Sequence, residues 1–325
     1  MQESATKFVP VSKYRFGVPV LTDDGEEGSL DSLIVDGPSR AITGIRARFG
    51  FFGRELYTLP ITAIRHANPD KVELHVTYDE MKRDYSTVTA ATLLAPNTRV
   101  IVGNKTIGKL TQVTVNRETH VLRHLVVRSI RGEELVAASS ITAIEGRHIV
   151  VASGANAPEQ TLLPYRPDEA LYDEIHAAIF DYPRLRVDLP GIGIRVIDGT
   201  LWLQGNVSSD LNTRLVQDQL ANIRGLGEIH NELVADTDLA SAVAEALSRD
   251  PRTARQQIGV YPQLGVINLR GRVRTEEARA AANEIAHSVR GARDVNNALI
   301  VDPEAEVIPV LAGVTNQEDR IPGGG

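Results

Sequence analysis

The 325-residue sequence contains no cysteine, two methionines, one tryptophan and only 5% aromatic residues. The absence of cysteine excludes disulfides, thiolate catalysis and cysteine-ligated zinc. Because aromatic residues are few, the cores must be built mainly from Val, Ile, Leu and Ala. No apolar run approaches the roughly 20 residues of a transmembrane helix, and the first residues contain no apolar stretch of signal-peptide length. We therefore expect a cytoplasmic protein without an integral membrane anchor.

The charge balance is mildly acidic, with a net charge of −7 and a pI near 5.7. A protein that coats nucleic acid needs a dominant basic surface, so we expect no nucleic-acid partner for the whole chain. Hydrophobic residues make up 42% and charged residues 24% of the sequence, which is ordinary for a globular protein. The length allows two to four domains.

The first half contains an internal repeat. The four-residue sequence Ile-Thr-Ala-Ile occurs at Ile61–Ile64 and at Ile141–Ile144, an offset of 80 residues. The same offset superposes Gly28 on Gly108 and further apolar positions on each other. Short segments rich in Val, Ile, Thr and Leu alternate with turn signals, and no clear helix separates them. This pattern predicts two small all-β barrels, at residues 14–85 and 94–151.

Both copies resemble the PRC-barrel family in a glycine-led entry strand, an apolar Ile-x-x-Ile stretch and a final Val-rich strand. The segments that carry the resemblance are Gly28–Asp36, Leu59–Ile64 and Val72–Val76, and then Gly108–Asn116, Ser139–Ile144 and His148–Val151. The family includes ribosome-maturation factors and the cytoplasmic domain of a photosynthetic reaction-centre subunit. The resemblance implies modules for protein–protein interaction and not for catalysis.

The second half contains another repeat, after a predicted linker at residues 152–167. Apolar residues with helical spacing recur at an offset of 68, from Leu171 to Ile179 and from Leu239 to Leu247. A strand–turn–strand unit follows each helix, with Asp198-Gly199 as a strong turn signal in the first copy. Capping residues then open a second helix, at Ser209 and at Thr275. The order α-β-β-α-β is predicted twice, at residues 168–236 and 237–302.

These two copies resemble the BON domain family. The resemblance lies in Trp202–Val207 with Ile223–Val234, and in Asn268–Val273 with Val289–Val301. Relatives are proposed to bind phospholipid or other envelope surfaces, and some belong to bacterial periplasmic stress proteins. Together with the PRC-like part, the resemblances cover residues 14–151 and 168–302. The predicted fold class is therefore multidomain, with two β barrels followed by two α+β domains.

The sequence offers few residues with the spacing of a catalytic or metal site. Its eight histidines are scattered, and no hydrolase, zinc-protease or nucleotide-binding motif occurs. Gly191-Ile192-Gly193 lacks the further glycine and the strand-to-helix position of a phosphate loop. We expect no catalytic residue, no metal and no cofactor, and hence not an enzyme.

Two glycines in matching strands, Gly205 and Gly271, have two interpretations. A ligand can approach such a position closely, or the glycine can permit a bulge or a tight backbone contact.

An arginine row is the best candidate for binding. Arg270, Arg272 and Arg274 alternate with Leu269, Gly271 and Val273, so the arginines face the side of the sheet away from the helices. Residues 168–236 carry five basic and twelve acidic side chains, net −7, whereas residues 237–302 carry nine and eight, net +1. The row can meet anionic lipid, meet the acidic sister module, or serve only as a solvated face.

The sequence thus predicts a non-catalytic binding or scaffold protein that acts through protein–protein contacts or self-association. The alternative is a peripheral binder of anionic phospholipid at the inner face of the membrane. Residues 303–325 are predicted to be a flexible tail, in which Val307–Val314 is a candidate docking peptide.

Overall fold

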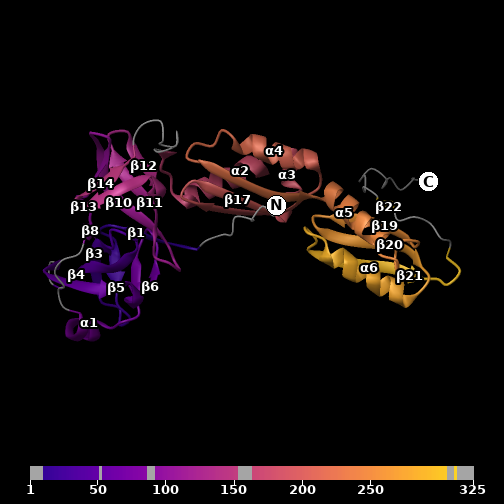
Figure 1. Cartoon of the computed structure of the whole chain (residues 1–325), viewed down its shortest axis with the longest axis horizontal. Coiled ribbons are helices and arrows are strands. Elements are labelled where there is room, and N and C mark those ends of the chain that lie inside the picture. Colours follow the sequence, from indigo (N-terminus) through magenta and orange to yellow (C-terminus); the bar gives the residue numbers. More distant parts are fainter. Residues whose placement is uncertain (1–9, 51–52, 86–91, 153–162, 306–310, 313–325) are drawn as a thin grey trace, which may run out of the picture. The chain divides into compact units, whose positions relative to one another are not determined.

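The computed structural model describes residues 10–50, 53–85, 92–152, 163–305 and 311–312. The chain divides into two compact units, Met1–Arg166 and Pro167–Gly325. Figure 1 shows a strand-rich first unit and a second unit of helices and sheets. The predicted multidomain α+β organisation is therefore present.

The first unit consists of two sheets that repeat one strand sequence. The first copy contains β1 Val11–Arg15, β2 Pro19–Leu21, β3 Glu27–Val35, β4 Ile42–Phe49, β5 Glu55–Pro60, η2 Ile61–Ala63, β6 Ile64–Ala67, β7 Val72–Leu74 and α1 Tyr78–Asp84. The second contains β8 Thr92–Leu94, β9 Arg99–Val102, β10 Lys105–Asn116, β11 Leu122–Ser129, β12 Gly132–Ala137, η3 Ala138–Ser140, β13 Ile141–Glu145, β14 His148–Val151 and β15 Leu163–Pro164. The sheet orders are β5-β4-β3-β2-β7-β6 and β13-β14-β9-β10-β11-β12-β15.

The two copies exchange their first strands. Strand β1 pairs with β10 of the second copy, with Tyr14 opposite Val113. Strand β8 pairs with β3 of the first copy, with Leu94 opposite Leu33. Tyr14 and Leu94 are 80 residues apart, and so are Leu33 and Val113. The exchange is therefore symmetric. One continuous hydrophobic core joins the two copies as a result.

An approximate twofold axis passes between Ala41 and Val121, which are 80 residues apart and form an isolated antiparallel bridge. The backbone N–H of Ile42 donates to His120 O at 2.9 Å, and that of Leu122 donates to Arg40 O at 3.0 Å. Arg40 and His120 both adopt a left-handed backbone, with φ of 56° and 57°. The duplicates therefore pair about a pseudo-twofold axis.

The two Ile-Thr-Ala-Ile segments that revealed the repeat do not superpose on each other in the structure. Ile61–Ala63 is a 3-10 turn, and its counterpart is Ala138–Ser140, at an offset of 77. Ile141 instead corresponds to Ile64, the first residue of β6. The hairpin loop between β4 and β5 is three residues longer than the loop between β11 and β12, and this difference shifts the offset from 80 to 77.

Two short elements of the first unit lie where the sequence indicated none. Helix α1 begins with a capping box, in which the Thr77 hydroxyl accepts from the Glu80 N–H and the Glu80 carboxylate accepts from the Thr77 N–H. The Thr-x-x-Glu spacing carries this signal, and the prediction of strands without a helix missed it. Leu163–Pro164, within the predicted linker, forms strand β15 along β12.

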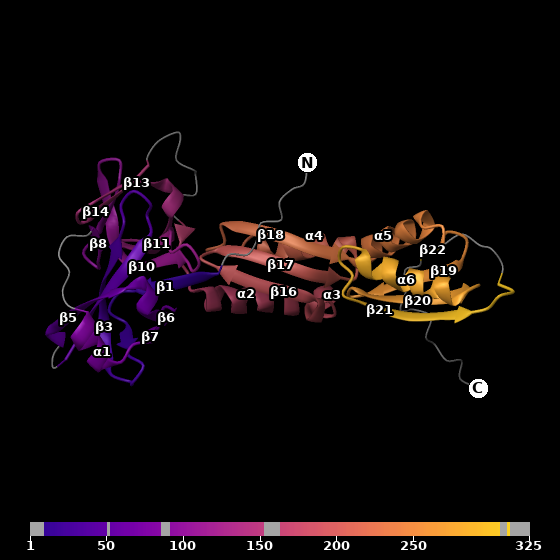
Figure 2. The ribbon, with the colours of Figure 1, turned by 60° about the horizontal axis from the view of Figure 1, so that its bottom comes forward.

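The second unit repeats α-β-β-α-β as predicted. The first module contains α2 Asp168–Phe180, α3 Pro183–Arg186, η4 Leu189–Gly191, β16 Ile192–Ile197, β17 Thr200–Val207, α4 Asp210–Leu220 and β18 Glu228–Ala235. The second contains α5 Asp236–Arg249, β19 Gln257–Gln263, β20 Val266–Val273, α6 Glu276–Ser288, β21 Asp294–Val301 and β22 Leu311–Ala312. In each sheet the central strand pairs antiparallel with its hairpin partner and parallel with the last strand. Both helices pack on one face of each sheet (Figure 2).

The second hairpin turn is Leu264-Gly265, which the sequence did not reveal. Leu264 has φ of 46° and Gly265 of 82°, a type I′ geometry like that of Asp198-Gly199. Leucine is strained in this conformation. The Asp236 carboxylate accepts from both turn N–H groups, at 2.6 Å from Leu264 and 2.9 Å from Gly265. Asp168 holds the Asp198 N–H in the same way, at 2.8 Å.

We predict that the two copies of the first unit unfold together, because they share one core. Ile45→Ala removes a fully buried side chain from the first copy and should cost about 2–5 kcal/mol of unfolding free energy. Hydrogen–deuterium exchange mass spectrometry should show faster exchange in β10 and β11 as well as in β3 and β4. Leu125→Ala, at the equivalent buried position, is the matched variant. Faster exchange confined to the mutated copy would contradict the shared core.

Candidate functional site

In the second module, the helices of the described residues leave the outer face of the sheet uncovered. On strand β20, Asn268, Arg270 and Arg272 alternate with the buried Ile267, Leu269 and Val273. Beside Arg270 lie Gly259 on one neighbouring strand and Ala298 on the other. The small neighbours leave the Arg270 side chain exposed. The other members of this outer face are Gln257, Tyr261, Asn296 and Ile300.

The three predicted arginines lie along this face but have different partners. Arg272 forms an ion pair with Asp302 at 3.0 Å. The Arg274 guanidinium donates to the Ala305 carbonyl at 3.1 Å. Arg270 lies over the Tyr261 ring at 5.9 Å from its centroid, and it has no carboxylate partner in the part of the chain that the structure describes. The row is therefore not a uniform band of free charge.

Gly205 and Gly271 occupy equivalent positions where two strands approach closely. Their φ angles are 112° and 128°. A Cβ on Gly205 would collide with the Gly191 carbonyl oxygen, and one on Gly271 with the Gln257 carbonyl oxygen. Backbone geometry alone is enough to require glycine at both positions.

The equivalent face of the first module is partly covered by the second module. Asn206, one strand position from Gly205, donates its amide to Gly291 O at 3.0 Å. Gly291 lies so close to Val234 that a Cβ on Gly291 would collide with the Val234 side chain. Gly265 of the type I′ turn sits equally close to the Asn206 amide. One module thus inserts a turn and a glycine loop against the end of the preceding sheet.

Two buried carboxylates lie behind this junction. Asp188 is 1% and Asp236 is 7% exposed. Asp188 accepts from the Asn212 amide at 2.6 Å and from the Ser208 hydroxyl at 3.1 Å. Burial raises the pKa of Asp236 above its usual range, the turn N–H groups oppose this rise, and the nearby Asp188 charge adds to it. Asp188 thus stabilises the start of α4 in the first module, Asp236 stabilises the hairpin turn of the second, and neither is exposed to a ligand.

The second module presents the corresponding surface at its own end. An offset of 66 relates Asn206 to Arg272 and Val234 to Ile300, and it relates Gly191 to Gln257 and Asp236 to Asp302. We call Gln257, Arg272, Ile300 and Asp302 the C-terminal sheet end. Ile300 is 62% exposed, although its counterpart Val234 is packed against Gly291. The sequence predicted the outward arginines but not this surface, which becomes visible only when the modules are superposed.

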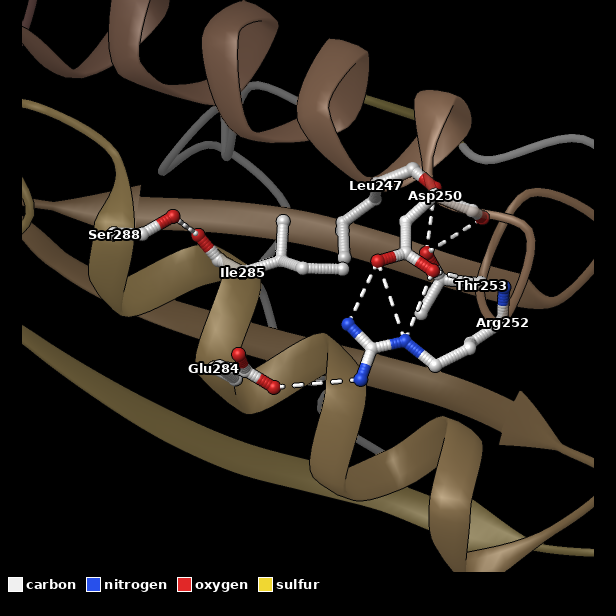
Figure 3. A network of polar contacts seen from close by, with 7 residues as sticks. All are labelled: Leu247, Asp250, Arg252, Thr253, Glu284, Ile285 and Ser288. Atoms are coloured by element: carbon white, nitrogen blue, oxygen red, sulfur yellow. Dashed lines mark hydrogen bonds and ion pairs between the residues drawn. The ribbon is translucent and has the colours of Figure 1, made fainter.

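On the opposite, helical side, a polar network fixes the loop that follows α5 (Figure 3). The buried Thr253 hydroxyl donates to Leu247 O at 2.6 Å. Arg252 pairs with Asp250 at 2.7 Å and reaches Glu284 of α6 at 3.4 Å. The network ties this loop to both helices.

The described residues contain no group of three His, Asp or Glu side chains placed to hold a metal ion. Among the helices of those residues, none has the length and apolar character needed to cross a membrane.

We predict that Gly271→Ala destabilises the second unit more than a left-handed φ alone would do. Its backbone strain should cost about 1–3 kcal/mol, and the collision with Gln257 O adds to this cost. Urea unfolding followed by the fluorescence of Trp202, the only tryptophan, measures the effect. Gly132→Ala is the control, because Gly132 has a similar φ of 118° and open space around it, and its effect is followed by far-ultraviolet circular dichroism. Equal losses in the two variants would contradict the close approach.

Comparison with known proteins identifies one domain. Residues 235–303 match the family profile of the BON domain, in agreement with the resemblance of the second copy. The PRC-barrel resemblance and the first BON-like copy stay predictions. No curated protein sequence matches the chain.

Two similar solved structures are of CdsD, a structural protein of the type III secretion system of Chlamydia trachomatis. One is 18% identical and covers 41% of this chain and 61% of that chain, with a TM-score of 0.34. The other, described as the C-terminal domain, is 17% identical and covers 42% and 66%, with a TM-score of 0.32. The first match thus spans about three fifths of the length of the protein compared. The part of this chain at residues 235–303 is a BON domain.

Proposed function

We propose that this protein is a non-catalytic scaffold that associates through its duplicated modules. The BON domain at residues 235–303 supports a binding role. The PRC-like resemblance of residues 14–151 implies further protein contacts. Several modest surfaces on one chain give high combined affinity without a strong single site.

One observation supports the C-terminal sheet end as the contact surface. The equivalent end of the first module already receives a turn and a glycine loop, at Asn206 and Val234. The contact is head-to-tail, since different surfaces of the two modules meet. Such heterologous contacts leave a free end for a further copy. We infer that a module from a second copy of the chain binds at Arg272 and Ile300.

Ile300→Lys should therefore abolish self-association, because it places a charge in an apolar contact that must lose water. Sedimentation velocity over a concentration series should show wild-type chains associating and the variant remaining monomeric. Ile130→Lys is the matched control, because Ile130 is fully exposed in a turn of the first unit. A wild-type chain that stays monomeric at all concentrations, or an Ile300→Lys variant that associates normally, would exclude this surface.

The second candidate is binding to anionic phospholipid, which would place the protein at a membrane surface. Arg270 favours it, because no carboxylate in the described part of the chain pairs with its exposed guanidinium. Each basic side chain near an anionic surface contributes about 1 kcal/mol. Arg272 already pairs with Asp302, so the available attraction is small.

Co-sedimentation with anionic liposomes at low and high salt tests this candidate. If lipid is the partner, binding should fall with salt and disappear when Arg270, Arg272 and Arg274 are all changed to Ser. Neutral liposomes are the control surface. Absence of binding by the wild-type protein would leave the protein-scaffold function alone.

A further inference from the structure

The two copies of the first unit carry related hollows of unequal size. The larger one, of about 980 Å³, lies over β3 and β4. The smaller, of about 260 Å³, lies over β10 and β11. Their linings correspond at the offset of 80: Leu30 with Leu110, Asp31 with Thr111, and Arg48 with Arg128. The larger hollow is also lined by Ser32, Arg46 and Leu56, whose counterparts do not line the smaller one.

In the second copy, the chain itself covers this region. Strand β15 adds to the edge of β12, with Leu163 opposite Leu135. The backbone N–H of Tyr165 donates to Glu133 O at 2.8 Å. The Tyr165 hydroxyl then accepts from the Gln112 amide at 3.1 Å. The Tyr165 side chain thus spans from the edge strand β12 to β10, across β11.

In the first copy, none of the described strands adds to the same edge. Strand β5 is the counterpart of β12, with Leu56 and Thr58 in the places of Glu133 and Leu135. It ends its sheet and pairs only with β4 in the part of the chain that the structure describes. Its backbone therefore presents the row of donors and acceptors that β15 satisfies in the second copy.

Two neighbouring positions at the larger hollow are polar in the first copy and apolar in the second. Arg46 stands at the position of Val126, which is 1% exposed. Thr58 stands at the position of Leu135, directly beside Arg46 across the strand pair. Arg46 Nε and Thr58 Oγ1 are buried and have no hydrogen-bond partner among the described residues. Such groups cost free energy until a ligand satisfies them.

The surrounding charges leave Arg46 available to an anion. Arg48, on the same strand, already pairs with Asp31 at 2.7 Å, so this carboxylate is neutralised. Arg147 also lines the hollow and is exposed. No carboxylate in the described ranges forms an ion pair with Arg46. The hollow is therefore complementary to a negative side chain.

We propose that the β5 edge binds an extended peptide, which adds as a strand and places an acidic side chain on Arg46. The occupant of the β12 edge, residues 163–165, is its geometric counterpart within this chain. Backbone bonds to Leu56 and Thr58 give affinity, and the arginine selects the side chain. A glutamate at the place of Tyr165 supplies two acceptors for the guanidinium.

Two eight-residue peptides test the site by fluorescence anisotropy with the full-length protein. One has the sequence of residues 160–167, and the other has Glu in place of its tyrosine. Wild-type protein should bind the Glu peptide at least about tenfold more tightly, a difference of 1.4 kcal/mol. Arg46→Val places the valine of the second copy at this position and should abolish this preference, because the guanidinium that selects the glutamate is gone. Arg131→Val, in an exposed turn, is the control and should change nothing.

Further measurements distinguish strand addition from a simple anion site. Circular dichroism of Arg46→Val shows whether the variant folds, and Arg46→Lys keeps the charge and should retain part of the preference. Free glutamate should displace the Glu peptide only weakly, because it lacks the backbone contacts. Displacement by equimolar free glutamate would indicate a simple anion site and overturn the strand addition. Equal binding of both peptides, or no binding up to about 1 mM, would also overturn the proposal.

Discussion

The exchange of first strands about Ala41 and Val121 is the constraint on which the first unit depends. Each central strand, β3 or β10, obtains a neighbour from the other copy. Without β8, the hydrogen-bonding groups of β3 that face it would be unpaired, and a buried unpaired backbone group costs as much as a lost hydrogen bond. The exchange also merges two small cores into one. Because buried area grows with size, one joint core is more stable than two separate ones.

The two duplications of the chain follow different symmetry. In the first unit the contact is mutual, since the residues at the axis meet their own equivalents. A mutual contact closes on itself and leaves no equivalent surface unused. In the second unit Asn206 meets Gly291, while Arg272, the counterpart of Asn206, remains exposed. This contact is head-to-tail, so the surface of the second module that corresponds to Asn206 and Val234 is not used within the pair. New binding surfaces in the first unit must instead come from residues that differ between the copies.

Local signals in the sequence predicted most of the second unit. The spacing of Leu171 and Ile175 indicated a helix face, and Thr275 indicated a helix start, because both depend on neighbours within one or two turns. The alternation of β20 predicted that Arg270 and Arg272 face outward. Their partners were not predictable, since Asp302 lies 30 residues from Arg272. The turn at Leu264 was missed for the same reason, because its left-handed conformation is held by Asp236, 28 residues away.

Long-range pairing explains the remaining differences in the first unit. Strand β1 pairs with β10 about 100 residues later, and nothing in the short Val11–Arg15 segment specifies that partner. The two Ile-Thr-Ala-Ile segments have the same sequence but different structural roles, because the β4–β5 loop before the first is three residues longer than the β11–β12 loop before the second. A repeat offset is thus reliable only between loops of equal length. The single offset of 80 pairs Arg46 with Val126, but only superposition of the copies in space places Thr58 at the position of Leu135.

That comparison separates the requirements of the fold from those of binding. Val126 shows that an apolar side chain satisfies the fold at this position, so the fold does not require the charge of Arg46. A partly buried guanidinium without a partner is unfavourable, because it loses water and gains no hydrogen bond. The same argument applies to Thr58, whose counterpart Leu135 has no polar atom. Arg46 and Thr58 lie next to each other at an open strand edge beside a cavity, where an added strand would supply the missing hydrogen-bond partners. The second copy supplies its own covering segment, and the first copy leaves that place to another chain.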